Sequence, residues 1–291
     1  MESIDCVICG KQSQSPFETV FDRLGENENT FHLVRCTCGF VFLNPRPTQT
    51  EIQNYYNVPD YDPHHEKQGN VWDSVYKFVQ TVTLKWKYRK ILPFEELGFL
   101  LDIGGGQGEF ANYMAEKNWY VYFQDDHSTI KRTLISNTIQ SYRHVKQIPD
   151  DVEFSVITLW HSLEHIHDVD FVFTYISEKL VEGGVAAIAV PNLNAPERKI
   201  FRSAWAPYDA PRHLYHFNLQ SLEDICEKYK LTVIRKYSMF QDAPYNILLS
   251  LTPLNPIKLI KAFFITLYAW IYTAIRGPKY SSSILLLCQK Q

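Results

Sequence analysis

The chain has 291 residues, of which 45% are hydrophobic, and its formal net charge is −3 at pH 7. This length is enough for one large α/β domain and a small satellite. The nearly balanced charge gives no sign of a nucleic-acid-binding surface, so we expect no nucleic-acid partner. The first ten residues are polar and predict no signal peptide, so we expect a cytoplasmic protein.

Two close pairs of cysteines stand near the N-terminus. Cys6 and Cys9 are spaced Cys-x-x-Cys, Cys36 and Cys38 are spaced Cys-x-Cys, and twenty-six residues separate the two pairs. Cysteines stay reduced in the cytoplasm, so close pairs indicate a metal site before a disulfide. Four thiolates can hold a structural zinc ion. Two alternatives stay open: His32 replaces Cys36 as a ligand, or the thiols only pack together.

Residues 45–92 connect this segment to the rest of the chain. Prolines interrupt the first half, where Tyr55, Tyr56 and Tyr61 cluster. Residues 71–92 then have the hydrophobic spacing of an amphipathic helix. We expect a helical linker or lid.

Residues 99–110, FLLDIGGGQGEF, predict a buried strand, a tight glycine turn and the start of a helix. Asp102 lies at the carboxyl end of the strand, where open α/β sheets bind ligands. The glycines do not follow the spacing of a phosphate-binding dinucleotide loop, and Glu109 at its third position would repel phosphate. Acids on both sides of the turn favour a cationic ligand without phosphates, such as S-adenosylmethionine (SAM). The candidate cofactor residues here are Asp102, Gly104, Gly105, Gly106 and Gln107.

A second acidic position follows the next predicted strand, 119–124. Asp125 and Asp126 come directly after it, and Asp125 lies twenty-one residues after Gly104. At about this distance nucleotide-binding folds place the acid that binds the ribose hydroxyls. Asp125 is the better candidate because it comes first off the strand. The alternative is a solvated turn that caps the next helix.

A third polar group follows the strand predicted at 154–160. The strand ends at Trp160, and His161, Glu164 and His165 come immediately afterwards. The carboxyl ends of parallel strands meet at one edge of a sheet, so we add Trp160 and His161 to the candidate cofactor site.

The remaining pattern predicts the class of the fold. Helices and strands alternate, which indicates a mostly parallel sheet with helices on both faces. The other expected elements are helices 107–117, 128–137 and 169–181 and strands 141–146, 184–190, 231–237 and 282–288.

An apolar run, 262–275, lies between the last two strands and has basic residues on both sides. Its fourteen residues are too few to span a bilayer, which needs about twenty. The run is compatible with an interfacial helix, a buried cap helix or a dimer contact. We therefore keep open a peripheral membrane contact or a dimer contact through 258–279. The first would place the protein at the inner face of the membrane.

Three motifs together resemble the class I SAM-dependent methyltransferases: DIGGGQG, the acid at Asp125, and ITLWHSLEHIHD. The closest resemblance is to the branch with an LEH motif after strand four. Residues 191–222 are similar to that branch's Trp…Asp-x-Pro-Arg-His-Leu-x-His-Phe segment. CVICG…CTCGFVFLNPRP…YY resembles the zinc-ribbon segment that precedes some of these enzymes, including sugar C-methyltransferases.

This resemblance implies a Rossmann-like, seven-stranded methyltransferase sheet whose final strand runs antiparallel. It divides the chain into a zinc-ribbon-like segment, a helical linker or lid, and a methyltransferase core with α-helical cap insertions. In the sugar C-methyltransferases a tyrosine from the linker reaches the active site, but the resemblance does not select which one. The divisions are 1–44, 45–92 and 93–291, with insertions at 192–230 and 241–281.

The implied activity is SAM-dependent methyl transfer to a small polar acceptor, a nucleotide sugar or a glycan. Such an enzyme positions the acceptor and, where needed, removes its proton. The LEH motif matches Glu164 and His165, His161 follows the same strand, and His213 comes from the cap segment. Two alternatives stay open: O-methylation of a quinone or lipid precursor at the membrane surface, and a non-catalytic scaffold with a SAM-type fold.

Overall fold

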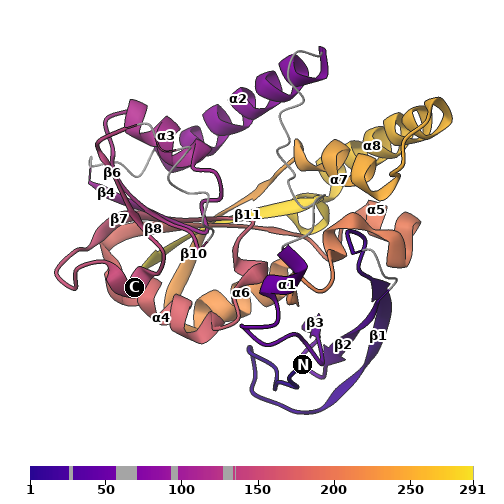
Figure 1. Cartoon of the computed structure of the whole chain (residues 1–291), viewed down its shortest axis with the longest axis horizontal. Coiled ribbons are helices and arrows are strands. Elements are labelled where there is room, and N and C mark those ends of the chain that lie inside the picture. The colour runs from indigo at the N-terminus through magenta and orange to yellow at the C-terminus, as the bar shows by residue number, and fades with distance from the viewer. Residues whose placement is uncertain (26–28, 57–70, 93–97, 127–133, 135, 291) are drawn as a thin grey trace.

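The structure is a computed structural model that describes the chain except for residues 26–28, 57–70, 93–97, 127–133, 135 and 291 (Figure 1). Tyr61 and most of the helix predicted at 128–137 lie outside the described residues.

Seven strands form the central sheet in the order β10-β11-β8-β7-β4-β5-β6. Strand β11 runs antiparallel to both of its neighbours, and the other pairings are parallel. This confirms the predicted seven-stranded sheet and its reversed final strand. Two strands begin earlier than expected, β6 by two residues and β8 by four. The strands are β4 (Phe99–Ile103), β5 (Tyr120–Gln124), β6 (Ile139–Tyr142), β7 (Phe154–Trp160), β8 (Leu180–Pro191), β10 (Leu231–Ser238) and β11 (Ser283–Lys290).

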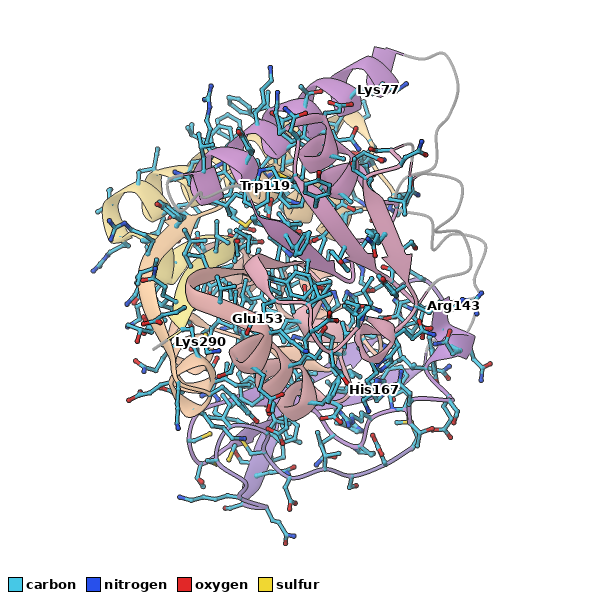
Figure 2. The ribbon with its side chains drawn as sticks, turned by 90° about the vertical axis from the view of Figure 1, so that its left-hand side faces the viewer. Lys77, Trp119, Arg143, Glu153, His167 and Lys290 are labelled. Atoms are coloured by element: carbon cyan, nitrogen blue, oxygen red, sulfur yellow. The ribbon has the colours of Figure 1, made fainter. Side chains whose placement is uncertain are left out.

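Helices cover both faces of this sheet. In Figure 1, α2 and α3 lie on one face, and α4 and α6 lie on the other. Side chains that alternate along β4 enter different clusters: Leu100 joins Phe110 of α3, and Leu101 joins Phe173 of α4. Figure 2 shows α2 from another side, with Lys77 near its outer end. These helices are α2 (Val71–Ile91), α3 (Glu109–Glu116), α4 (Val169–Lys179) and α6 (Leu219–Lys228).

A smaller sheet has the order β1-β2-β3-β9. Its first three strands come from the N-terminal segment, but β9 comes from the insertion predicted at 192–230. Val41 pairs with His216, and the Leu43 amide donates to the Leu214 carbonyl at 2.9 Å. The N-terminal segment is therefore hydrogen-bonded to that insertion. The strands are β1 (Gln14–Phe21), β2 (Thr30–Cys36), β3 (Val41–Leu43) and β9 (Tyr215–His216).

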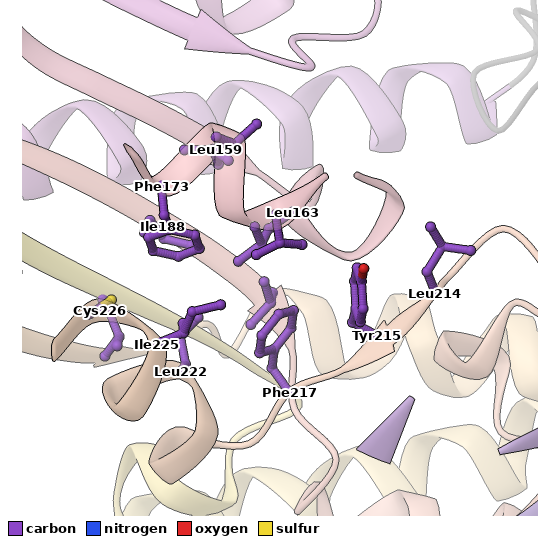
Figure 3. Packing of buried hydrophobic residues seen from close by; sticks show 14 of the residues in the cluster. Leu159, Leu163, Phe173, Ile188, Leu214, Tyr215, Phe217, Leu222, Ile225 and Cys226 are labelled. Atoms are coloured by element: carbon purple, nitrogen blue, oxygen red, sulfur yellow. The ribbon is translucent and has the colours of Figure 1, made fainter. Parts of the chain in front are cut away.

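The same insertion contributes to the main core. Figure 3 shows Leu222 and Ile225 of α6 packed near Phe173 and Ile188, so this part of 192–230 covers the sheet. The second insertion forms the hairpin α7–α8 between β10 and β11. Helix α8 has 21 residues and extends beyond the predicted apolar run on both sides. The remaining helices are α1 (Gln53–Tyr56), α5 (Pro196–Phe201), α7 (Asp242–Ser250) and α8 (Pro256–Arg276).

Candidate active site

The glycine turn between β4 and α3 forms a narrow backbone cradle. The amides of Gly104 and Gly105 donate to the Gln124 carbonyl at 2.8 and 3.1 Å, which holds the turn against β5. A Cβ atom at Gly105 would lie 2.6 Å from Asp102 Oδ2 and 2.4 Å from the Phe123 ring. Only glycine therefore allows this close approach of the backbone.

Asp102 is buried beside this turn. Thr158 Oγ1 donates to its Oδ1 at 2.6 Å, whereas its Oδ2 has no hydrogen-bond partner among the described residues. Burial raises the pKa of Asp102 to about 7, although Thr158 and the Lys87 ammonium act in the opposite direction. A buried carboxyl group with an unpaired oxygen is suited to a cationic ligand group.

Asp125 follows β5 and is buried against the same turn. The Gly106 amide donates to its Oδ2 at 2.8 Å, so the acid and the glycine turn form one unit. Asp126, the next residue, is exposed. Gln107 lies half-buried in the turn. The structure therefore brings the predicted cofactor residues of β4 and β5 together and leaves Asp126 at the surface.

Trp160 ends β7 and contributes an aromatic surface. Its ring lies edge-on to Phe110 with 5.3 Å between the ring centres. The Nζ atom of Lys87, from α2, lies 4.6 Å from the centre of the Trp160 ring. Burial lowers the pKa of Lys87, and Asp102 and Asp242 partly offset this effect. Helix α2 thus places a cation among the predicted cofactor residues.

His161 bridges two acidic side chains. Its backbone is left-handed with φ 56°, its Nε2 lies 3.0 Å from Asp242 Oδ2, and its Nδ1 lies 3.6 Å from Glu164 Oε1. Burial alone would lower the pKa of His161, but the two carboxylates raise it to about 9. His161 is therefore protonated at neutral pH and is suited to positioning Glu164 rather than to accepting a proton.

His165 and His213 lie edge to face, with their ring centres 4.5 Å apart. The Nδ1 atom of His165 is 3.0 Å from the Tyr56 hydroxyl and 3.1 Å from the Arg212 carbonyl. The Nδ1 atom of His213 is 2.8 Å from the Pro207 carbonyl. A proton on His165 Nδ1 is donated to the Arg212 carbonyl and leaves Nε2 of His165 able to accept a proton. Nε2 of His213 lies 4.0 Å from Asp209 Oδ2. Burial and His213 lower the pKa of His165 to about 4, so its ring is uncharged at neutral pH.

Glu164 completes this cluster. It is 1% exposed, and its carboxylate oxygens accept no hydrogen bond from the described residues. Burial would raise its pKa, but His161 and His213 hold it below the usual value. One ligand atom from each of Glu164, His165 and His213 lies within 4.8 Å of the others. Such a set could bind the polar groups of an acceptor or a divalent cation.

Arg212 ties the surrounding segments together. Its side chain is fully buried, and Nη2 lies 2.9 Å from Asp22 Oδ1 and 2.7 Å from Asp209 Oδ1. Its Nη1 donates to the Tyr55 carbonyl at 3.2 Å. The N-terminal segment, the linker and the 192–230 insertion therefore meet at one guanidinium, directly beside His165.

Comparison with known families identifies the fold and the class of enzyme. A family model described as a methyltransferase domain matches residues 76–236, more than half of the chain. The chain belongs to this methyltransferase family. The predicted assignment as a class I SAM-dependent methyltransferase is confirmed, and the enzyme interpretation is supported over the scaffold. No curated protein matches the chain.

Three solved structures that are similar to this methyltransferase share 14–18% sequence identity with it. A Galdieria sulphuraria protein assigned as a sarcosine dimethylglycine methyltransferase is 16% identical, with a TM-score of 0.49 over 77% of this chain and 89% of its own. Phosphoethanolamine N-methyltransferase 2 of Haemonchus contortus, solved with SAM, is 18% identical. The match has a TM-score of 0.46 and covers 70% of this chain and 52% of the Haemonchus contortus chain. A SAM-dependent methyltransferase of Archaeoglobus fulgidus is 14% identical. The match has a TM-score of 0.48 and covers 76% of this chain and 100% of the Archaeoglobus fulgidus chain.

The four predicted metal ligands of the methyltransferase converge at its N-terminal end. Cys6 Sγ lies 3.6 Å from Cys38 Sγ, Cys9 Sγ lies 3.4 Å from Cys36 Sγ, and one atom of each residue lies within 4.8 Å of the others. A tetrahedron with Zn–S bonds of about 2.3 Å has sulfur atoms about 3.8 Å apart, so the cluster is close to the size required. His32 is not part of this cluster and lies near Thr19 instead, with 3.4 Å between Nδ1 and Oγ1.

Three residues near the methyltransferase site were not assigned a place in it from the sequence. Lys87 lies on α2, Asp242 begins α7, and Tyr56 ends α1. The resemblance predicted that a linker tyrosine reaches the site, and Tyr56 contacts His165. Nothing in the local sequence distinguishes Lys87 or Asp242 from a surface charge, because each contacts the site only through tertiary packing.

Proposed function

We propose that this methyltransferase modifies a small polar acceptor of the nucleotide-sugar or glycan class. The observation that carries the proposal is the cluster of Glu164, His165, His213 and Tyr56 near the predicted cofactor residues. Several hydrogen-bonding groups in one buried cluster are suited to an acceptor with several hydroxyl groups. We further propose that the enzyme works in the cytoplasm.

The predicted cofactor residues suit SAM in charge. We assign the ribose hydroxyls to Asp125, which is held against the glycine turn by the Gly106 amide, and the unpaired oxygen of Asp102 supports binding of a cationic group nearby. Gly105 packs directly against Phe123 and Asp102, whereas a Cβ atom at Gly106 would meet no atom within 4 Å, so the turn is open at Gly106. The full proposed set is Asp102, Gly104, Gly105, Gly106, Gln107, Asp125, Asp126, Trp160 and His161. When bound, SAM supplies an electrophilic methyl group and a neutral sulfide leaving group.

The chain's own contribution to the chemistry is to hold the acceptor and remove its proton. His165 Nε2 accepts the proton from a hydroxyl, or from a carbon acidified by a neighbouring carbonyl, while Nδ1 stays bound to the Arg212 carbonyl. His213 is the alternative base, oriented in the same way by Pro207. Glu164 accepts hydrogen bonds from acceptor hydroxyls, and protonated His161 keeps Glu164 charged.

An acceptor screen tests this proposal. The full-length protein is incubated with SAM and a panel of nucleotide sugars and glycans, and both S-adenosylhomocysteine and the methylated product are measured by mass spectrometry. We expect product from at least one member and little from His165→Gln, which should bind SAM normally. SAM binding without methylation of any member, together with methylation of a quinone precursor, would contradict the acceptor class.

One observation favours a second candidate, O-methylation of a quinone or lipid precursor. Asp242 of the site is the first residue of α7, and α7 packs against α8, whose outer side is apolar and exposed. Quinone precursors and soluble lipid headgroups therefore form the second panel of the screen.

We also propose one structural zinc ion bound by Cys6, Cys9, Cys36 and Cys38. The supporting observation is that their sulfur atoms converge without forming disulfides. Burial would raise the pKa of Cys36, but hydrogen bonds from the Cys38 amide and the neighbouring thiols lower it to about 7, which favours a thiolate. The ion would stabilise a segment that is too small to form a large core.

A further inference from the structure

Helix α8 has an apolar surface on the side that faces away from the protein. Its buried stripe, which includes Ala262, Ile265 and Ala269, packs on α7. The exposed side of a helix in a globular protein is normally polar, but here it is also apolar. The residues of this side that are more than half exposed, which we call the apolar face, are Ile257, Ile260, Phe263, Phe264, Ile271 and Ile275.

The apolar face is larger than a scattering of single exposed side chains. Leu267, Tyr268 and Trp270 on α8 are also exposed, as are Tyr245 and Leu249 on α7. Soluble monomers rarely expose contiguous apolar patches of more than a few hundred Å² unless the patch binds something. Such a surface indicates an apolar partner for the hairpin.

The charge around this hairpin has one sign. No Asp or Glu follows Asp242, whereas Lys258, Lys261, Arg276 and Lys279 flank the apolar run. The last 49 residues carry five basic side chains and no acidic one, and the first 242 carry the other 24 basic and all 32 acidic side chains. The partner of this surface is therefore expected to be apolar with negative charges at its border.

The connection of the hairpin to the sheet decides its orientation. Ser238 of β10 pairs with Ile284 of β11, so the chain leaves and re-enters the sheet at neighbouring positions. Among the described residues, α8 is the one helix long and apolar enough to cross a membrane by length and composition. A single crossing would separate its two ends, and α7, with nine residues, is too short to return. The helix is therefore expected to lie along a surface, over about 31 Å.

We propose that the α7–α8 hairpin docks flat on an anionic lipid bilayer. The apolar face enters the boundary between headgroups and acyl chains, and the flanking Lys258, Lys261, Arg276 and Lys279 contact the acidic headgroups. A second copy of the chain is a poorer partner, because a two-fold contact through this face would bring the same basic residues together. The inference rests on this surface alone and does not depend on the proposed acceptor.

Vesicle co-sedimentation of the full-length protein tests the proposal. Vesicles of phosphatidylcholine with about 30% phosphatidylglycerol should bind the protein, vesicles of phosphatidylcholine alone should bind it less, and about 0.5 M salt should weaken binding. The double variant Phe264→Glu/Ile271→Glu should lower the partition coefficient at least about tenfold. Its matched control is Phe21→Glu/Tyr120→Glu, which places the same charges at exposed aromatic positions outside the hairpin and should keep binding.

Two further measurements separate the alternatives. Titration with SAM verifies that each variant is folded and reports separately on the proposed cofactor site. Light scattering after gel filtration gives the mass in solution. Failure of the wild-type protein to bind anionic vesicles would overturn the proposal. A dimer that Phe264→Glu/Ile271→Glu converts to a monomer, without vesicle binding, would assign the face to a second copy instead.

Discussion

Replacing Arg212 with methionine would remove a cation that joins three segments beside His165. The guanidinium lies 2.9 Å from Asp22 and 2.7 Å from Asp209, and the side chain of Asp22 is only 3% exposed. Methionine fills most of the same space but leaves a buried carboxylate without its partner. Breaking a buried ion pair in this way costs about 3–5 kcal/mol, so we expect the free energy of unfolding to fall by that amount.

Urea unfolding followed by tryptophan fluorescence would measure this loss, with Arg235→Met at an exposed arginine as the control. The double variant Arg212→Met/Asp22→Asn should recover about 1–3 kcal/mol, because the more deeply buried of the two unpaired charges, that of Asp22, is then also gone. A loss below about 1 kcal/mol in the single variant would refute the argument that Arg212 neutralises buried carboxylates.

Three further predictions concern the metal, the cofactor and the base. Purified protein should carry about one equivalent of zinc, and chelation should unfold the N-terminal segment before the core; metal-free protein prepared without a chelator would count against the site. Because burial raises the pKa of Asp102 to about 7, a cationic ligand must displace its proton below that pH. SAM affinity measured by titration should therefore rise with pH, by up to about tenfold per unit, and level off above pH 7, and Asp102→Asn should remove this dependence. His165→Gln should keep SAM affinity and lower turnover by roughly 10²–10⁴-fold. Normal turnover in His165→Gln with loss of turnover in His213→Gln would assign the base to His213.

The central sheet was predictable because its information is local. The inner strands β4, β5 and β7 are short, mostly apolar runs, and the polar residues that end or follow them lie at the carboxyl edge in any parallel sheet. The bounds of β6 and β8 differed by a few residues, because pairing with neighbouring strands, rather than composition, sets where a strand begins.

The second sheet could not be predicted in the same way. Its strand β9 has two residues and pairs with β3 across more than 170 positions of sequence, so no local pattern marks it. The same limit applies to the site. Glu164 and His165 follow a strand, whereas Lys87 and Asp242 contact the site from helices far away in the sequence. Periodicity predicts α2 without indicating that Lys87 faces inward, and no local pattern predicted α7 as a separate helix.

The central claim is that SAM binds at the glycine turn beside Asp102 and Asp125. Calorimetric titration with SAM tests this claim most directly. The wild-type protein should bind one equivalent. Asp125→Ala should weaken binding by roughly 1.5–3 kcal/mol, because it loses hydrogen bonds to a charged group, whereas Asp151→Ala, at an exposed acid outside the proposed cofactor set, should change it little. Failure of the wild-type protein to bind SAM, or equal affinity in Asp125→Ala, would contradict the assignment of this site.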